Sequence, residues 1–109
     1  MHHSQSQPAS QVKEAIFAEL YQQHAPPIFA YLCHRVDRYE DAEDLLLEVF
    51  TAALQEEKLL QIDTTQQASW LWRVARNRVI DRFRQAKRRS VLALEEVVEL
   101  LYEDQAIEK

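Results

Sequence analysis

The chain has no glycine among its 109 residues. Tight hairpin turns and β-bulges mostly need glycine or asparagine at positive φ, so a sheet-based fold is disfavoured. Strong helix formers, namely alanine, leucine, glutamate, glutamine and arginine, dominate the composition instead. A chain of this length can bury enough surface to fold around one core without disulfides. The sequence therefore predicts a single all-α domain.

Hydrophobic periodicity predicts two helices in the first part of the chain. Apolar residues recur every three or four positions over 12–20, which predicts the first helix. Pro26 and Pro27 lack the backbone N–H donor, so they end or kink this helix. The apolar stripe resumes at Ile28, which predicts the second helix.

Two further helices are predicted in the second half of the chain. One spans 41–56, and its core face consists of Ala42, Leu45, Leu46, Val49 and Ala53. The other starts near Ser69 and packs through Trp72, Ala75, Val79, Phe83 and Ala86. An irregular loop over 58–67 separates them, and a short helix or an ordered linker follows Ser90. We therefore predict a compact bundle of four helices plus a short C-terminal helix.

Positive charge is concentrated in one helix-length segment. Residues 70–89 carry eight lysine and arginine residues against one aspartate, whereas the rest of the chain carries five basic against seventeen acidic residues. The net charge of −5 thus conceals a basic surface, which is typical of a nucleic-acid site. One side of this helix presents groups that can bind phosphates and a base edge: Trp70, Arg73, Asn77, Arg84 and Arg88. A merely solvated basic face is the alternative.

Two further features allow both a functional and a structural interpretation. Trp70 and Trp72 lie about 200° apart around the helix axis, so only one of them is predicted to point into the core. The other either stacks on an unpaired base or plugs the end of the bundle. The helix over 41–56 has an acidic outer side, which could dock a basic partner, although the spacing alone favours a solvated face. This side consists of Asp41, Asp44, Leu47 and Glu48.

The sequence gives little support for an enzyme, a cofactor or a metal site. Without glycine there is no phosphate-cradling loop, and His24 and His34 lack metal-ligand spacing. Cys33 is the single cysteine, and we predict that it is a small buried residue. The lack of a long apolar run and of a signal peptide predicts a soluble, cytoplasmic protein. Residues 1–10 are predicted to be a disordered leader or a cloning remnant.

Three blocks of the sequence resemble region 2 of bacterial sigma factors, most closely those of the extracytoplasmic-function (ECF) branch. The blocks are FAELYQQHAPPIFAYL, DAEDLLLEVF and WLWRVARNRVIDRFRQAKRR, and the similarity runs from about Phe17 to Arg89. The resemblance implies a promoter-recognition subunit that binds core RNA polymerase and helps to open the minus-ten region. It implies no bond chemistry, and it allows an anti-sigma factor as a further partner.

The resemblance also assigns two surfaces. In the family, the helix of the second block docks on the clamp coiled coil of the largest polymerase subunit. The matching positions are Asp41, Asp44, Leu45, Glu48, Val49 and Phe50. The loop and the helix that follow capture the non-template strand of promoter DNA. The matching segment runs from Lys58 to Gln67 and continues with Trp70, Arg73, Arg76, Asn77 and Arg84, with Arg88 on the same predicted face.

The chain departs from the family pattern at three points. Leu47 stands where family members usually have glutamine, which makes the docking face more apolar. Pro26 and Pro27 are doubled. The chain ends without the second, helix-turn-helix domain that reads the minus-thirty-five element, which favours a fragment over a free-standing domain. We predict a sigma region 2-like domain over 11–90 and an acidic helix or linker over 91–109.

Two other functions stay open at this point. A stand-alone helical DNA-binding or adaptor protein would keep the fold without engaging polymerase. An interaction module would pair its basic stripe with an acidic protein, and the segment from Glu95 to Glu103 of the same chain would then be autoinhibitory. In the sigma-factor interpretation, the acidic remainder weakens binding of the free protein to DNA, so recognition should depend on prior assembly with polymerase.

Overall fold

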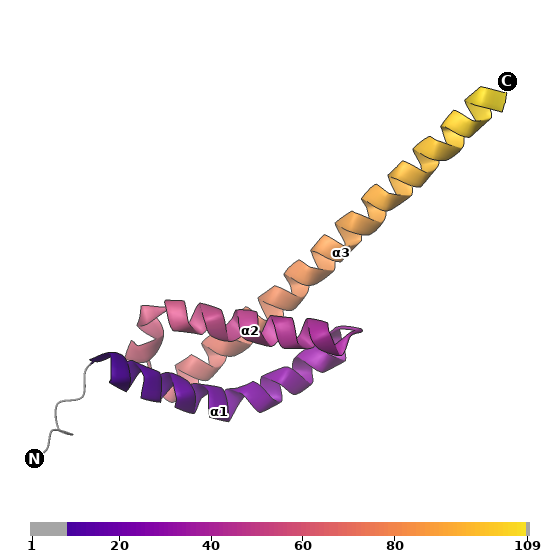
Figure 1. The fold of residues 1–109 in the computed structure, drawn as a ribbon. Helices are drawn as coiled ribbons and strands as arrows, with labels where there is room; N and C mark the ends of the chain where they lie inside the picture. The colour runs from indigo at the N-terminus through magenta and orange to yellow at the C-terminus, as the bar shows by residue number, and fades with distance from the viewer. Residues whose placement is uncertain (1–8, 109) are drawn as a thin grey trace, which may run out of the picture. The chain divides into compact units, whose positions relative to one another are not determined.

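The computed structural model describes residues 9–108 and the side chains of residues 11–103. Three α-helices and one 3-10 helix follow one another in this range (Figure 1). They are α1 (Ala9–Arg35), α2 (Tyr39–Gln55), η2 (Glu57–Gln61) and α3 (Thr64–Glu108). The all-α prediction is therefore confirmed. The chain divides into two compact units, residues 1–79 and residues 80–109.

α1 runs through Pro26 and Pro27 as one helix, so the predicted division into two helices is wrong. Both prolines are exposed, so water can reach the carbonyl groups that the missing N–H donors leave unpaired. The inner side of the helix keeps its apolar stripe, with Leu20, Ala25, Ile28 and Leu32 all buried. Packing of this stripe outweighs the cost of the prolines, and α1 bends near its middle (Figure 1).

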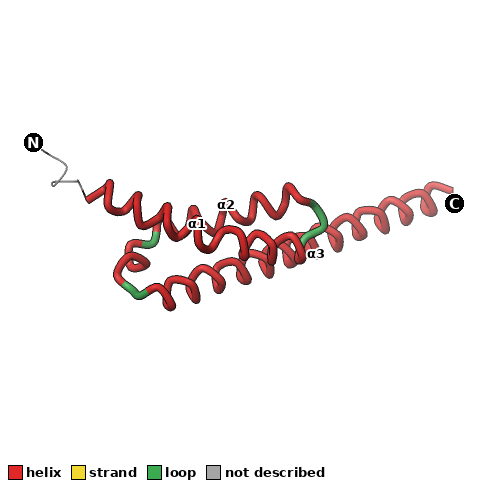
Figure 2. The backbone as a smooth tube through the Cα atoms, turned by 90° about the horizontal axis from the view of Figure 1, so that it is seen from below, coloured by secondary structure: helices red, strands yellow, loops and turns green. Residues whose placement is uncertain are grey.

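The core of the first unit lies between α1, α2 and the first part of α3, and α1 packs beside α2 (Figure 2). α2 contributes the predicted stripe, in which Ala42, Leu45, Val49 and Ala53 are buried and Leu46 is partly buried. Phe50 is also buried and meets the rings of Phe17 and Tyr21 edge to face, at centroid distances of 6.1 and 4.8 Å. These contacts fix which side of α2 faces outward.

The connection between α2 and α3 is more regular than predicted. The irregular loop expected over 58–67 is replaced by η2, a short link and the first turn of α3. Asp63 and Gln66 form a capping box at this point. Asp63 Oδ1 accepts from the Gln66 backbone N–H at 2.8 Å, and Gln66 Oε1 accepts from the Asp63 backbone N–H at 3.4 Å. The capping box starts α3 at Thr64, well before the predicted start near Ser69.

Within the first unit, α3 buries a stripe with a four-residue spacing. This stripe consists of Gln67, Leu71, Ala75 and Val79. Ala75 and Val79 were predicted to lie in the core, and this is confirmed. Trp72, predicted on the same stripe, is only partly buried. Because the stripe begins at Gln67, Leu71 takes the central position that the prediction gave to Trp72.

The second unit contains the rest of α3, which continues as one helix to residue 108. The separate C-terminal helix predicted after Ser90 is therefore wrong, because the residues that follow are helix formers with no proline or glycine to stop the helix. Phe83 and Ala86 were predicted to pack, but both are exposed. The predicted bundle of four helices plus one is thus three α-helices and a 3-10 helix in residues 9–108.

Several smaller predictions can be compared with the structure. Cys33 is exposed, so its predicted burial is wrong, because the neighbouring Leu32 takes the core position. Residues 1–8 of the predicted leader lie outside the described residues. None of the described helices combines the length and apolarity needed to cross a membrane. Within the same part of the chain, no cluster of three or more His, Cys, Asp or Glu side chains could hold a metal ion.

Candidate functional site

The outward face of α2 is acidic and has one apolar side chain at its centre. Asp44 is exposed and Leu47 is 68% exposed, while Asp41 and Glu48 are partly buried. The first turn of α2 contains Glu40 and Asp41, where carboxylates suit the positive end of the helix dipole. The buried stripe on the opposite side of α2 holds this face toward solvent.

Three residues of the predicted polymerase-contact set lie in the core instead. Leu45 and Val49 have no exposed surface, and Phe50 is 3% exposed. A direct contact with a partner would require α2 to leave the core. These residues therefore support the outer face of α2 from within the core. The sequence motif lists residues from both faces of α2, and only the burial of each side chain shows which of them face outward.

A groove beside Leu47 contains residues that sequence reasoning missed. The groove has a volume of about 430 Å³ and is lined by Tyr21, Phe29, Tyr39, Glu43, Leu46, Leu47 and Phe50. Phe29 and Tyr39 meet edge to face, with their ring centroids 5.3 Å apart. The spacing of Tyr21 and Phe29 could have revealed this groove, because it places both residues on one side of a continuous helix. Sequence analysis missed it because it assigned the two residues to separate helices, divided at the prolines.

Within the first unit, α3 presents a cationic outer face. Arg73, Arg76 and Asn77 are exposed, and Trp70, Arg73 and Asn77 follow the spacing of one helix side. No ion pair involves Arg73 or Arg76 in the part of the chain that the structure describes. The two guanidinium groups are thus available to an external anion.

Both tryptophans near the start of α3 pack partly against the core, so the prediction that only one does so is wrong. Trp72 meets Tyr31 edge to face at a centroid distance of 5.4 Å. Trp70 is also partly buried, and it lies on the same side of α3 as Arg73. Only a part of the Trp70 ring is therefore open to solvent.

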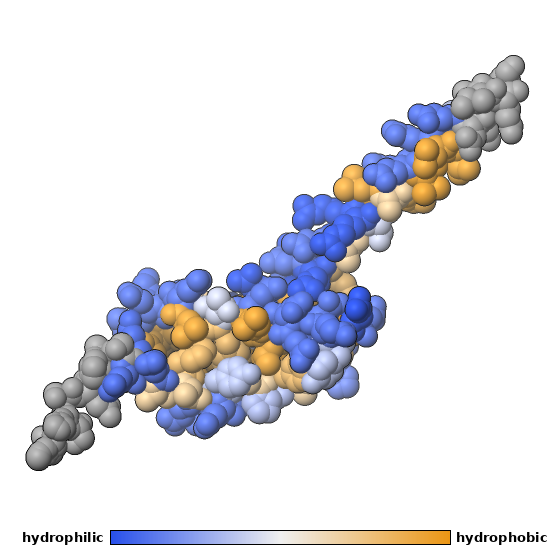
Figure 3. Space-filling model, viewed as in Figure 1, coloured by the Kyte–Doolittle hydropathy of each residue, from blue (hydrophilic) through white to orange (hydrophobic). Residues whose placement is uncertain are grey.

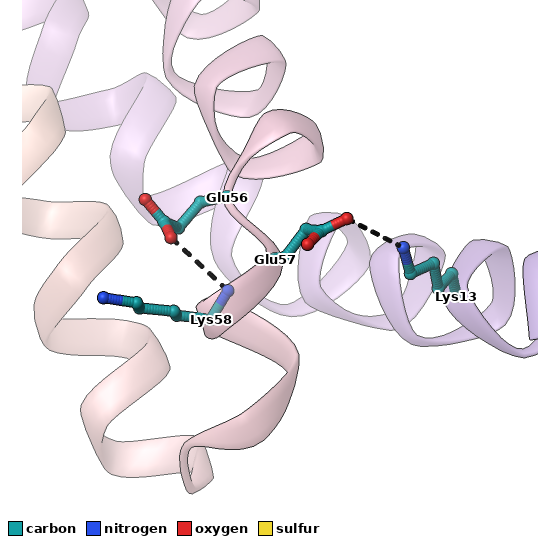
Figure 4. Close-up of polar contacts among 4 residues, drawn as sticks. All are labelled: Lys13, Glu56, Glu57 and Lys58. Carbon is teal, nitrogen blue, oxygen red and sulfur yellow. Dashed lines mark hydrogen bonds and ion pairs between the residues drawn. The ribbon is translucent and has the colours of Figure 1, made fainter.

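Lys58 is exposed on η2, as a residue that contacts nucleic acid must be. Its backbone N–H donates to Glu56 Oε2 at 3.3 Å, which holds the first turn of η2 (Figure 4). The neighbouring Glu57 forms an ion pair with Lys13 of α1, with 3.8 Å between Oε1 and Nζ. The side chain of Lys58 points away from this pair (Figure 4).

Gln67, the other end of the predicted strand-capturing loop, is buried. Its Nε2 donates to the backbone carbonyl oxygen of Leu59 at 2.9 Å. This bond fastens the first part of α3 to η2. The amide of Gln67 therefore faces the protein interior in this structure, and the residue can influence a bound strand only through the position of η2.

An ion pair between Arg78 and Glu48 joins the two candidate surfaces of the first unit. Arg78 Nη1 lies 3.9 Å from Glu48 Oε1, and each side chain is 42% exposed. A pair exposed to this extent contributes about 1 kcal/mol or less. It removes one carboxylate from the acidic face of α2 and one guanidinium from the basic segment. Asp44 and Leu47 remain exposed on α2.

The remaining two predicted DNA contacts, Arg84 and Arg88, lie in the second unit and are exposed. Both line a shallow groove with Val91 and Leu92. The segment from Glu95 to Glu103 follows on the same continuous helix. The proposed autoinhibitory contact of this segment with Arg84 or Arg88 of its own chain would therefore require the helix to break.

Comparison with known proteins links these surfaces to a family. Residues 20–89 match Sigma-70 region 2, and this range contains α2, η2 and the basic part of α3. The ECF RNA polymerase sigma factor SigL of Mycobacterium tuberculosis is 30% identical over 84 residues, which cover 77% of this chain and 48% of the relative. No solved structure matches.

Two further relatives carry similar names. The ECF RNA polymerase sigma factor BldN of Streptomyces coelicolor is 32% identical over 71 residues, covering 65% of this chain and 27% of the relative. The ECF RNA polymerase sigma factor RpoE of Cereibacter sphaeroides is 34% identical over 71 residues, which cover 65% of this chain and 39% of the relative. The chain thus spans about half the length of these relatives or less. Since the matched segment includes most of the chain, the protein belongs to the Sigma-70 region 2 family, with relatives among the ECF sigma factors.

Proposed function

We propose that this domain acts in transcription initiation by binding core RNA polymerase and capturing the non-template strand of the promoter minus-ten element. One observation carries the proposal: a single packed unit exposes an acidic and apolar face on α2 and a cationic face on α3. Family membership supports this assignment, and each of the named relatives is an RNA polymerase sigma factor. We assign the activity to residues 11–90 and a linker role to residues 91–109.

The proposed polymerase surface is the outer face of α2. Asp41 and Asp44 would attract a basic helical partner, and Glu48 would join them on exchanging Arg78 for a cation of the partner. Leu47 would insert between the side chains of the partner. Leu47 is the most exposed apolar side chain on this helix, so its burial on docking contributes more than that of its neighbours. The aromatic groove beside Leu47 would receive an apolar side chain of the partner. Leu45, Val49 and Phe50 would keep this surface rigid.

The proposed strand-binding surface lies on η2 and α3. Arg73 and Arg76 would bind phosphates through bidentate hydrogen bonds, and Asn77 would pair with a base edge. Trp70 offers part of its ring for stacking, and Lys58 adds charge. Arg84 and Arg88 would add phosphate contacts. We assign Gln67 a positioning role, since its amide is used by Leu59.

Binding of a labelled minus-ten non-template oligonucleotide, with and without core polymerase, tests the proposal. We expect weak binding by the chain alone and much tighter binding by the complex. Asp44→Ala should weaken assembly with polymerase, and it should change the residual binding of the free chain to the oligonucleotide no more than Glu19→Ala, which removes the same charge. Asn77→Ala should leave assembly intact and weaken oligonucleotide binding by the complex by about tenfold, since one bidentate base contact is worth about 1–3 kcal/mol.

Exposed residues of α1 provide matched controls. Glu19→Ala removes a carboxylate and Gln22→Ala removes an amide, and neither residue lies on α2 or α3. Neither control should change assembly with polymerase or oligonucleotide binding by the complex. A chain that fails to associate with core polymerase in a pull-down, while it still binds DNA, would instead be a stand-alone DNA-binding module.

A further inference from the structure

The second unit carries an apolar seam along one side of its helix. The seam consists of Ile80, Phe83, Val91, Leu94, Val98 and Leu101, whose positions fall within one arc of the helix, and Lys87 interrupts it between Phe83 and Val91. Their side chains are 45–64% exposed. Figure 3 shows hydrophobic side chains exposed along the later part of α3. A long run of exposed apolar side chains on a single helix is typical of an interaction surface.

Charges of opposite sign follow one another beside this seam. On one flank, Arg84 and Arg88 come first, and Glu95 and Glu99 follow. Each pair has a four-residue spacing, so like charges lie next to each other along the helix, which is unfavourable. Within the described residues, no ion pair involves any of these four side chains. A helix with the reverse order of charges would therefore complement this flank.

We propose that the seam binds the same seam of a second copy of this chain in an antiparallel arrangement. When Val91 of one copy lies opposite Leu94 of the other, Arg88 comes close to Glu95 of the second copy and Arg84 to Glu99. The two-fold axis generates each contact twice. In a parallel arrangement this flank would instead face the other flank of the second copy, which carries Ala86, Ala93 and Val97, so the four charges would lack these partners of opposite sign. The order of charges thus selects both the partner and its orientation.

The antiparallel pair would bury the seam over residues 80–101, a length of about 33 Å at 1.5 Å per residue. It would also occupy Arg84 and Arg88, two of the proposed phosphate contacts. Self-association would therefore compete with strand binding at these two residues. This consequence rests on the proposed function, whereas the self-association does not, and the experiment below uses no polymerase and no DNA.

Sedimentation equilibrium of the full chain over a range of concentrations tests the proposal. We expect a monomer–dimer equilibrium that weakens as salt is added, because the flanking charges are solvent-exposed. Leu94→Lys should abolish the dimer. Leu100→Lys is the matched control, because Leu100 and Leu94 are 61% and 64% exposed and Leu100 lies away from both the seam and the charged flank of the helix. A monomer at every concentration, or equal effects of the two variants, would overturn the proposal.

Charge reversal tests the antiparallel register. Arg88→Glu and Glu95→Arg should each weaken the dimer by about tenfold, as expected for the loss of close charge pairs. The double variant restores opposite charges only if residue 88 faces residue 95 of the other copy, so it should recover the affinity of the unmodified chain. A double variant weaker than either single variant would rule out this register. Circular dichroism of each variant should show unchanged helicity.

Discussion

The Gln67 amide is buried, and it donates to the carbonyl oxygen of Leu59, a residue that is itself buried. A buried carbonyl group that loses its donor costs about 1–3 kcal/mol, because it keeps neither water nor a protein partner. The bond also joins η2 to α3, and these elements carry Lys58 and Trp70. A single side chain therefore links the stability of the unit to the geometry of the proposed strand site.

Replacement of this amide should destabilise the protein measurably. We expect Gln67→Ala to lower the free energy of unfolding by about 1–3 kcal/mol, as measured by urea denaturation. Gln61→Ala is the control, since Gln61 is an exposed glutamine at the end of η2, and it should change stability by about 0.5 kcal/mol or less. Equal effects of the two substitutions would show that the buried hydrogen bond contributes little.

At the scale of elements, sequence patterns predicted α2 well because its two faces differ strongly. Ala42, Leu45, Val49 and Ala53 were assigned to the core from spacing alone, and all four are buried. The periodicity of a half-buried helix is a local property, so it can be read without knowledge of its neighbours. The candidate docking face follows from the same pattern, because Asp44 and Leu47 occupy the opposite side.

The prediction failed where tertiary packing or a short polar motif decides the structure. Pro26 and Pro27 are strong local signals for a helix end, yet packing of Ile28 and Leu32 continues α1 through them. The start of α3 depends on the capping box at Asp63, in a segment without hydrophobic periodicity. In the same segment, the burial of Gln67 depends on a carbonyl group eight residues earlier in the chain.

Removal of the two prolines should therefore stabilise α1. Proline in a helix interior is about 3 kcal/mol less favourable than alanine, and the loss of its restriction on the unfolded chain offsets about 0.4–1 kcal/mol of this gain. We expect the double variant Pro26→Ala and Pro27→Ala to raise the free energy of unfolding by at least about 1 kcal/mol in urea denaturation. Gln23→Ala, an exposed change in the same helix, controls for helix propensity. A decrease in stability would mean that the core needs the bend of α1.

For the molecule as a whole, the separation of positive and negative charge along the chain determines how the free protein interacts with a polyanion. The net charge is −5, but the residues with basic side chains are concentrated over 70–89. The first unit keeps Arg73 and Arg76 exposed, and the ion pair between Arg78 and Glu48 links its two candidate surfaces. A polyanion approaching the free chain thus meets a local attraction and an overall repulsion, and the balance depends on ionic strength.

This balance predicts how the free chain responds to salt. Affinity for a single strand falls with salt at a logarithmic slope of about −0.7 for each phosphate contact. We expect Arg73→Ala with Arg76→Ala to make the slope shallower by about 1.4, whereas Asn77→Ala should weaken binding with little change in slope. Fluorescence anisotropy titrations of the minus-ten oligonucleotide at several salt concentrations measure both quantities.

Arg38→Ala is the control for this experiment, because Arg38 is an exposed arginine between α1 and α2 and is not one of the proposed phosphate contacts. It lowers the net charge by one, whereas the double α3 variant lowers it by two, so the change in slope per charge removed separates a general charge effect from a phosphate contact. At physiological salt the free chain should bind duplex promoter DNA only weakly. Tight duplex binding under these conditions would mean that the acidic surface does not restrain the basic one, and recognition would then need no polymerase.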